Sequence, residues 1–256
     1  MSATLDAIQY YPVKGLSAQV LDSVTLTPGG CLPHDRRFAI LHRATQFDPL
    51  APAWKPKTNF LVLLRDEKLA TLQAVFDPAT CMLVLNRNGK RVAGGRIDTA
   101  TGRLLIDQFL SAYMKDAAVP GPYKIVESPG HNFTDIPDKA VSLLNLASVK
   151  DIGRVTQRPV DPLRFRANLH LAGLAPWAEM GWVDKRIAIG DTVLSVFKTT
   201  TRCAAVEVNP TTGERDMALL KALKSGFEHV VCGVYARVEQ GGEIKAGDAV
   251  RVLEQP

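Results

Sequence analysis

The sequence predicts a mainly β or α+β protein, with an N-terminal β-barrel-like domain followed by a second β-barrel domain that carries a few peripheral helices. Short runs rich in β-branched and aromatic residues recur along the chain and are divided by glycine, proline and asparagine. Helical periodicity is confined to a few stretches. The 256 residues are enough for two modest hydrophobic cores.

The first third of the chain reads as short strands separated by turn residues. A hairpin is expected around Asn88-Gly89, because both residues tolerate a positive φ. The strands predicted in this part are Leu5–Val13, Val20–Thr27, Phe38–His42 and Phe60–Leu64, with Cys81–Leu85 and Arg91–Ala93 as the two arms of the hairpin.

A helix is predicted over Asp98–Met114, where apolar residues recur at helical spacing and Asp98 or Thr99 can cap the first turn. The Pro120-Gly121-Pro122 segment then resembles a hinge. We therefore expect one domain over residues 1–120 and a second over residues 121–256.

The second domain is again read as strands with short helices. The Asp216–Gly226 stretch is amphipathic and predicts a surface helix. The other elements expected here are a short helix at Ala147–Ile152 and strands at Phe165–Ala172, Arg186–Ile189, Val193–Thr199, Val230–Val238 and Ala249–Leu253.

Composition limits the classes of function. Hydrophobic residues make up 46% and charged residues 22%, as in ordinary globular proteins. No apolar run approaches the roughly 18 residues of a membrane span, and the N-terminus lacks the order of a signal peptide, so a cytoplasmic protein is expected. The net charge of +5 could favour an anionic ligand, but the basic residues are dispersed, which argues against nucleic acid.

The four cysteines form no CxxC pair and no zinc-ligand spacing. Cys203 directly follows Arg202 at the end of a predicted strand, and a neighbouring guanidinium favours the thiolate that acts as nucleophile or soft-metal ligand. The alternative is a small buried side chain. A Cys–His hydrolase has no local signature here, and Cys31, Cys81 and Cys232 are interpreted as core or incidental residues.

Basic residues near predicted strand ends could bind an anion. If Phe165–Ala172 is a strand, Arg164, Arg166 and Asn168 share one face and form an array of donors, or else a solvated outer face. Lys14-Gly15 at a turn could approach a phosphate closely, or could be an ordinary turn with an exposed lysine.

Taken in chain order, several segments resemble the MOSC-domain proteins that have an N-terminal β-barrel. The segments are Tyr11-Pro12-Val13-Lys14-Gly15, Asp35-Arg36-Arg37-Phe38, Arg164-Phe165-Arg166-Ala167-Asn168, Pro176-Trp177-Ala178-Glu179, Ile189-Gly190, Thr201-Arg202-Cys203, Val208-Asn209-Pro210-Thr211-Thr212-Gly213, Gly233-Val234-Tyr235 and Ile244-Lys245-Ala246-Gly247-Asp248.

Within that group the sequence resembles the mitochondrial amidoxime-reducing components and their bacterial counterparts, which reduce N-hydroxylated compounds with a molybdenum–molybdopterin cofactor. The resemblance implies that Cys203 ligates the metal and is the catalytic residue, and that a separate electron-transfer protein serves a small-molecule substrate. The positions that it implies in contact with the pterin or its phosphate are Lys14, Gly15, Arg36, Arg166, Asn168, Thr201, Arg202 and Tyr235.

The sequence departs from that pattern at several positions. Gly15 and Ala167 stand where animal members have serine and proline, and Lys139 is the candidate replacement for a Thr-Ser pair. Two other functions stay open: a sulfur carrier that uses Cys203 as a persulfide, and a binding protein that keeps only the fold.

Overall fold

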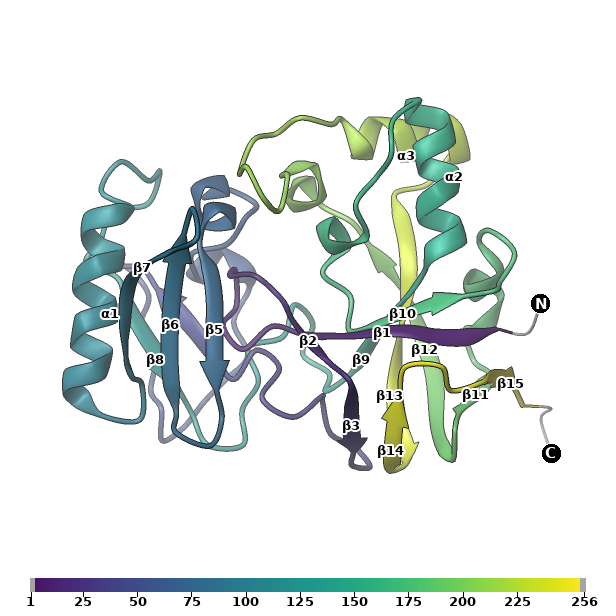
Figure 1. The fold of residues 1–256 in the computed structure, drawn as a ribbon, viewed down its shortest axis with the longest axis horizontal. Coiled ribbons are helices and arrows are strands. Elements are labelled where there is room, and N and C mark those ends of the chain that lie inside the picture. Colours follow the sequence, from purple (N-terminus) through teal and green to yellow (C-terminus); the bar gives the residue numbers. More distant parts are fainter. Residues whose placement is uncertain (1–2, 254–256) are drawn as a thin grey trace.

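The computed structural model describes residues 3–253, which form two lobes joined side by side (Figure 1). The first lobe is built on short antiparallel pairings with one helix against them. Its elements are β4 (Phe38–Leu41), β5 (Gln73–Asp77), β6 (Met82–Arg87), β7 (Lys90–Arg96), β8 (Lys124–Glu127) and α1 (Ala100–Tyr113). The strands pair as β5-β6-β7 and β4-β8.

The second lobe contains an eight-stranded sheet in the order β15-β11-β12-β13-β9-β10-β1-β2. Helices α2 and α3 lie together at one end of this lobe (Figure 1). The elements are β1 (Thr4–Tyr10), β2 (Gln19–Leu21), β9 (Val141–Asn145), β10 (Leu169–Ala172), β11 (Arg186–Ile189), β12 (Thr192–Thr201), β13 (Val231–Gln240), β15 (Val250–Val252), α2 (Leu146–Thr156) and α3 (Leu219–Phe227).

The chain crosses between the lobes in both directions. Strand β1 pairs with β10, and β3 (Ser23–Leu26) pairs with β14 (Gly242–Lys245), so the first strands complete sheets whose other members come from the second half. In return, β8 pairs with β4 of the first lobe. The division into domains of residues 1–120 and 121–256 stays a prediction, and this strand exchange shows how closely the two halves are joined.

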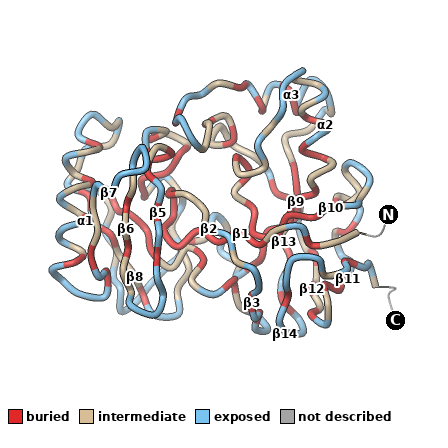
Figure 2. The backbone as a smooth tube through the Cα atoms, in the orientation of Figure 1, coloured by how far each residue is buried: buried red, intermediate tan, exposed pale blue. Residues whose placement is uncertain are grey.

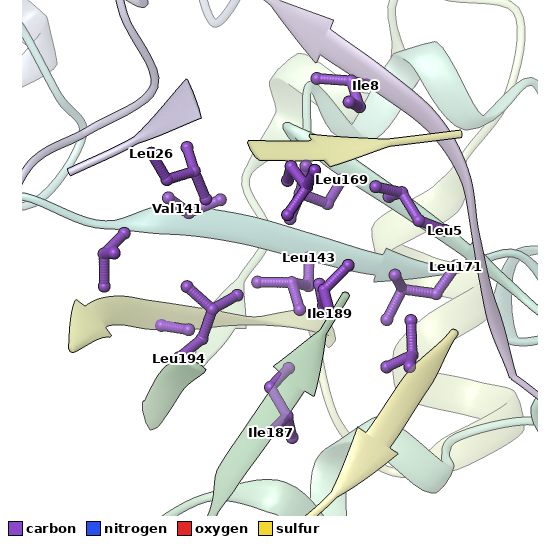
Figure 3. Close-up of a cluster of buried hydrophobic side chains, with 14 of the residues drawn as sticks. Leu5, Ile8, Leu26, Val141, Leu143, Leu169, Leu171, Ile187, Ile189 and Leu194 are labelled. Atoms are coloured by element: carbon purple, nitrogen blue, oxygen red, sulfur yellow. The ribbon is translucent and has the colours of Figure 1, made fainter. Parts of the chain in front are cut away.

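Buried residues lie mainly along the strands of each lobe, while many loop residues are exposed (Figure 2). In the second lobe, Leu5 and Ile8 of β1 pack on residues of β9, β10 and β11 (Figure 3). Alternate residues of a strand point to one face, which is how Leu169 and Leu171 of β10 both reach this core. The sheet therefore provides a rigid frame for the loops at its edge.

The predicted fold class is confirmed, as are several local predictions. At the tip of the hairpin, Asn88 and Gly89 adopt φ values of 51° and 72°. The side chain of Thr99 accepts a hydrogen bond from the amide of Gly102 at 3.1 Å, which makes Thr99 the N-cap of α1. The amphipathic stretch near residue 220 forms α3.

The prediction of a strand over Phe165–Ala172 is wrong in its first half. Residues Pro162–Phe165 form a 3-10 helix, Arg166 has a left-handed backbone with φ of 51°, and β10 begins only at Leu169. The helix starts because Asp161 accepts a hydrogen bond from the amide of Leu163 at 2.8 Å and Pro162 has the fixed φ of a first helical residue. The proposed shared face of Arg164, Arg166 and Asn168 therefore does not exist.

Other strands differ from the prediction. Val20–Thr27 is divided into β2 and β3 at Asp22, and Phe60–Leu64 makes one isolated bridge instead of a strand. The strands that the sequence analysis missed are β5, β8, β9 and β14. No helix within residues 3–253 is long and apolar enough to cross a membrane.

Candidate functional site

A cavity of about 310 Å³ lies where the two lobes meet. Its wall is assembled from segments far apart in the sequence: the turn before β4, the loop after β8, the turn before β10 and the end of β12. Residues from these segments include Arg36, Asp135, Arg166 and Cys203. Cavities between domains are common sites for ligands, because two walls can shape one pocket.

Cys203 is placed at this cavity by the end of β12. Its backbone is extended, with φ of −124° and ψ of 173°, and the 3-10 helix Ala204–Glu207 starts directly after it. The thiol is partly buried and also lines an adjoining cavity of about 40 Å³. A thiol in this position is accessible to a ligand yet shielded from bulk water.

The other three cysteines have different surroundings. Cys31 and Cys232 are buried, and burial raises the pKa of Cys31 to about 11 and that of Cys232 to about 12, so both stay protonated thiols. Cys81 lies next to the hairpin of the first lobe, with its thiol toward the carbonyl of Pro78 at 3.9 Å. These three match the prediction of core or incidental residues.

Lys57 is the neighbour of Cys203 that the sequence analysis missed. It begins the 3-10 helix Lys57–Asn59 and lines both cavities together with Cys203. Burial lowers the pKa of Lys57, but the neighbouring Cys203 and Asp135 raise it more, so that the ammonium stays charged. Lys57 follows a proline-rich segment without periodicity, and nothing in the sequence connects it to Cys203.

Arg36 and Arg166 occupy neighbouring positions on the cavity wall. Nη2 of Arg36 donates to the carbonyl of Arg166 at 2.9 Å, and Nη1 of Arg36 forms an ion pair with Asp35. Burial lowers the pKa of Arg36, yet Asp35 and Asp135 raise it above its usual value. The guanidinium of Arg166 makes no hydrogen bond or ion pair with the described residues, so its donors are available to a ligand.

Arg202 and Asn168 line the cavity but use their polar atoms on the protein. Nη1 of Arg202 donates to the carbonyl of Phe165 at 2.7 Å, and its Nε donates to the carbonyl of Cys232 at 2.8 Å. Oδ1 of Asn168 accepts from the hydroxyl of Ser142 at 2.8 Å. Both residues hold segments of the cavity wall together.

Thr201 and Tyr235 come from paired strands at the cavity. Thr201 is the last residue of β12 and is exposed, and Tyr235 lies on β13 opposite Ser142. Burial raises the pKa of Tyr235, so the phenol is neutral at physiological pH. The Tyr235 hydroxyl makes no hydrogen bond within the described part of the chain and can therefore donate one to a ligand.

Lys14 and Gly15 line the smaller cavity but not the 310 Å³ one, and Gly15 also lines a further cavity of about 380 Å³. Nζ of Lys14 donates to the carbonyl of Phe133 at 3.0 Å and pairs with Asp135. Gly15 has a φ of 89°, and a Cβ there would lie 2.6 Å from the carbonyl oxygen of Leu61. The close approach that requires glycine is thus to another loop of the protein.

The cavity has more positive than negative charge to offer a ligand. Its carboxylates Asp35, Asp135 and Asp138 pair with Arg36, Lys14 and Arg237. Arg164 pairs with Asp216 at 2.6 Å and Arg37 with Glu127 at 2.6 Å, and Arg37 does not line the cavity. Among the described residues that line the cavity, the cations without a carboxylate partner are Lys57, Arg166, Lys198 and Arg202. Such a wall attracts an anion such as a phosphate.

Fold and site together define a two-lobed β protein with a thiol beside a cationic cavity. The chain belongs to the MOSC domain family: residues 121–251 match the MOSC domain and residues 2–118 match the MOSC N-terminal beta barrel domain. The predicted resemblance is confirmed.

Curated relatives and one solved structure extend this result. Mitochondrial amidoxime-reducing component 1 of Homo sapiens is 29% identical over 98% of this chain and 83% of its own. Molybdenum cofactor sulfurase of Caenorhabditis briggsae is 35% identical over 45% of this chain, and the match spans only 17% of the sulfurase. The YUAD protein from Bacillus subtilis has the same fold, with a TM-score of 0.51 at 12% identity over 100% of this chain and 98% of that one.

Proposed function

We propose that this protein is a molybdenum-cofactor-binding oxidoreductase that reduces N-hydroxylated or N-oxide compounds with electrons from a separate partner protein. The observation that carries the proposal is the accessible thiol of Cys203 in a cavity with unpaired cations. Similarity to an amidoxime-reducing component over nearly the whole chain supports it.

The residues present fit a molybdenum–pterin cofactor. Thiolate is a soft ligand that suits such a metal, and Cys203 is the described thiol that lines the cavity. The unpartnered guanidinium of Arg166 and the ammonium groups of Lys57 and Lys198 suit the phosphate of the pterin. Cys203 would hold the metal, and Arg36, Arg166 and Arg202 would line the phosphate and pterin.

When bound, the cofactor would supply the two-electron redox change that cleavage of an N–O bond requires. The protein residues position the cofactor and place charged and polar groups around it. Lys57 places a positive charge on the same cavity walls as Cys203. Tyr235 offers a neutral hydroxyl to a bound ligand. Asn168 holds the turn at Arg166 against β9 through its hydrogen bond with Ser142.

A second candidate function is sulfur transfer, with Cys203 as a persulfide carrier. It is favoured by the similarity of about half of the chain to molybdenum cofactor sulfurases.

We further propose a cytoplasmic location. The four free cysteines support it, because cytosolic reductants keep thiols reduced.

Metal and pterin analysis tests the proposal. The wild type, expressed in a host that makes molybdenum cofactor, should retain near-stoichiometric molybdenum and pterin, whereas Cys203→Ser should lose most of the metal because a hydroxyl is a much poorer soft-metal ligand. Cys232→Ser is the matched control and should retain both. A wild type without metal and pterin but with sulfane sulfur on Cys203 would favour sulfur transfer.

A further inference from the structure

Two like-charged side chains of the cavity wall lie on one aromatic ring. The guanidinium carbons of Arg36 and Arg166 lie 4.8 and 4.3 Å from the ring centroid of Tyr11. Like charges repel, and each lowers the pKa of a neighbouring cation, so an arrangement that brings two arginines together needs a compensating attraction. The face of an aromatic ring provides it, since its quadrupole attracts cations.

Both arginines also have an uncommon backbone. Arg36 has a φ of 48° and Arg166 a φ of 51°, in the left-handed region that favours glycine. Such residues persist only where surrounding contacts hold them, and they cluster at ligand clamps. Both turns therefore carry arginine at positions where glycine would be less strained. This indicates that the guanidinium groups are needed at the cavity.

Tyr11 is fixed by the same group of residues. Only 1% of it is exposed, and its amide donates to Oδ1 of Asp35 at 2.8 Å. Asp35 pairs with Arg36, whose own amide donates to the carbonyl of Tyr11 at 2.7 Å. These hydrogen bonds and the ion pair link Tyr11, Asp35 and Arg36 to one another, so the ring of Tyr11 and the Arg36 side chain keep one relative position.

The hydroxyl of Tyr11 takes no part in these contacts. It is buried and has no hydrogen-bond partner among the described residues, and burial raises its pKa to about 12, which keeps it neutral. A buried hydroxyl without a partner adds no favourable contact. The contribution of Tyr11 to the site is therefore its ring.

We propose that Tyr11 is a positioning residue for anion binding, whose ring holds Arg36 and Arg166 together so that both guanidinium groups serve one phosphate-bearing ligand. The inference rests on the proposed function, in which that phosphate belongs to the pterin cofactor. Arg36 and Arg166 both border the large cavity and the small one, so a phosphate between the lobes is within the reach of this pair.

The test uses the full chain, produced in a host that makes no pterin, with inorganic phosphate as the probe and calorimetry as the measurement. Tyr11→Phe should bind phosphate as the wild type does. Tyr11→Leu should bind roughly tenfold more weakly, and pentafluorophenylalanine at position 11 should do the same, because fluorination removes the attraction for cations at nearly constant shape.

Tyr10→Leu is the matched control, because Tyr10 is buried beside Tyr11 but carries no arginine on its ring. It should keep the phosphate affinity of the wild type even if it lowers stability. If Tyr11→Leu does not fold, the comparison of phenylalanine with its fluorinated form decides. Equal phosphate affinities of these two would overturn the inference.

Pterin analysis separates this inference from the proposed function. If the wild type retains pterin when made in a host with molybdenum cofactor and binds phosphate when made without it, while the ring variants bind phosphate equally well, only the role of Tyr11 is refuted. A wild type that binds neither phosphate nor pterin would refute both.

Discussion

The side chain of Glu179 is 0% exposed and forms no ion pair with any residue between 3 and 253. Its oxygens accept hydrogen bonds from Nδ2 of Asn145 at 2.8 Å and from the hydroxyl of Ser148 at 2.8 and 3.0 Å. Burial raises the pKa of Glu179 above its usual 4.5, and the hydrogen bonds oppose this only in part. The residue fixes the segment Ala178–Trp182 to the start of α2.

A pH dependence of stability follows from Glu179. Because its pKa is higher in the folded than in the unfolded chain, its contribution is most favourable below pH 4.5 and is lost as the pH rises through the folded pKa. Glu179→Gln removes this titration. In urea unfolding between pH 4.5 and 8, the wild type should lose stability relative to the variant by about 1 kcal/mol or more as the pH rises. A constant difference across this range would contradict the assignment.

At the scale of elements, α1 packs on β7 through two glycines. A Cβ on Gly102 would lie 1.9 Å from the carbonyl oxygen of Arg96, and one on Gly95 would lie 2.6 Å from the carbonyl oxygen of Gly102. Glycine within a helix normally costs stability relative to alanine. Here the close crossing of helix and strand outweighs that cost.

Gly102→Ala should therefore destabilise the protein by about 1–3 kcal/mol, opposite to the effect of helix propensity. Thr101→Ala, at the exposed adjacent position of the same helix, is the control and should change stability by less than about 0.5 kcal/mol. Chemical denaturation of the three proteins measures both effects. A stabilised Gly102→Ala would show that the helix can move away from β7.

The elements that sequence patterns predicted are those with a local cause. The Asn88-Gly89 turn, the Thr99 cap and the amphipathic face of α3 each depend on residues a few positions apart. Strand β9 was missed because all five of its residues are buried, so it has no alternation of polar and apolar side chains. Its pairing with β10 and β13 is set by residues far away in the chain.

Part of the candidate site was also predictable from residues that are close together in the sequence. The Arg202-Cys203 pair is adjacent in sequence, and family resemblance added the remaining positions. Lys57 could not be found, because its approach to Cys203 depends on the meeting of two lobes. The turn at Arg166 differs from the predicted strand because Asp161 and Pro162 start a 3-10 helix, which ends at Arg166.

For the whole molecule, Arg215 ties the two lobes together. Its guanidinium donates to the carbonyls of Leu63 and Leu64 at 3.0 and 2.8 Å and to the carbonyl of Ala204 at 2.8 Å. The first two acceptors belong to a loop of the first lobe, and the third follows Cys203. The Arg215 side chain thus holds the segment after Cys203 against the first-lobe loop that contains Leu63 and Leu64.

Arg215→Gln should lower the free energy of unfolding by about 1–3 kcal/mol, because it leaves several carbonyls without their charged donor. Arg154→Gln is the control, since Arg154 is 71% exposed and its one ion pair within the described part of the chain is with Asp151 on its own helix. That exposed pair should contribute less than about 1 kcal/mol. Equal losses from the two variants in urea unfolding would mean that Arg215 does not join the lobes.

The exchange of strands between the lobes also sets an order of events during synthesis. Leu5 pairs with Leu171, and Val24 pairs with Ile244, so these two pairings can form only after the distant strands β10 and β14 have been synthesised. Contacts between residues so far apart in sequence form slowly. Until those partners are made, a nascent chain of this protein carries β1 and β3 without the strands that complete their sheets.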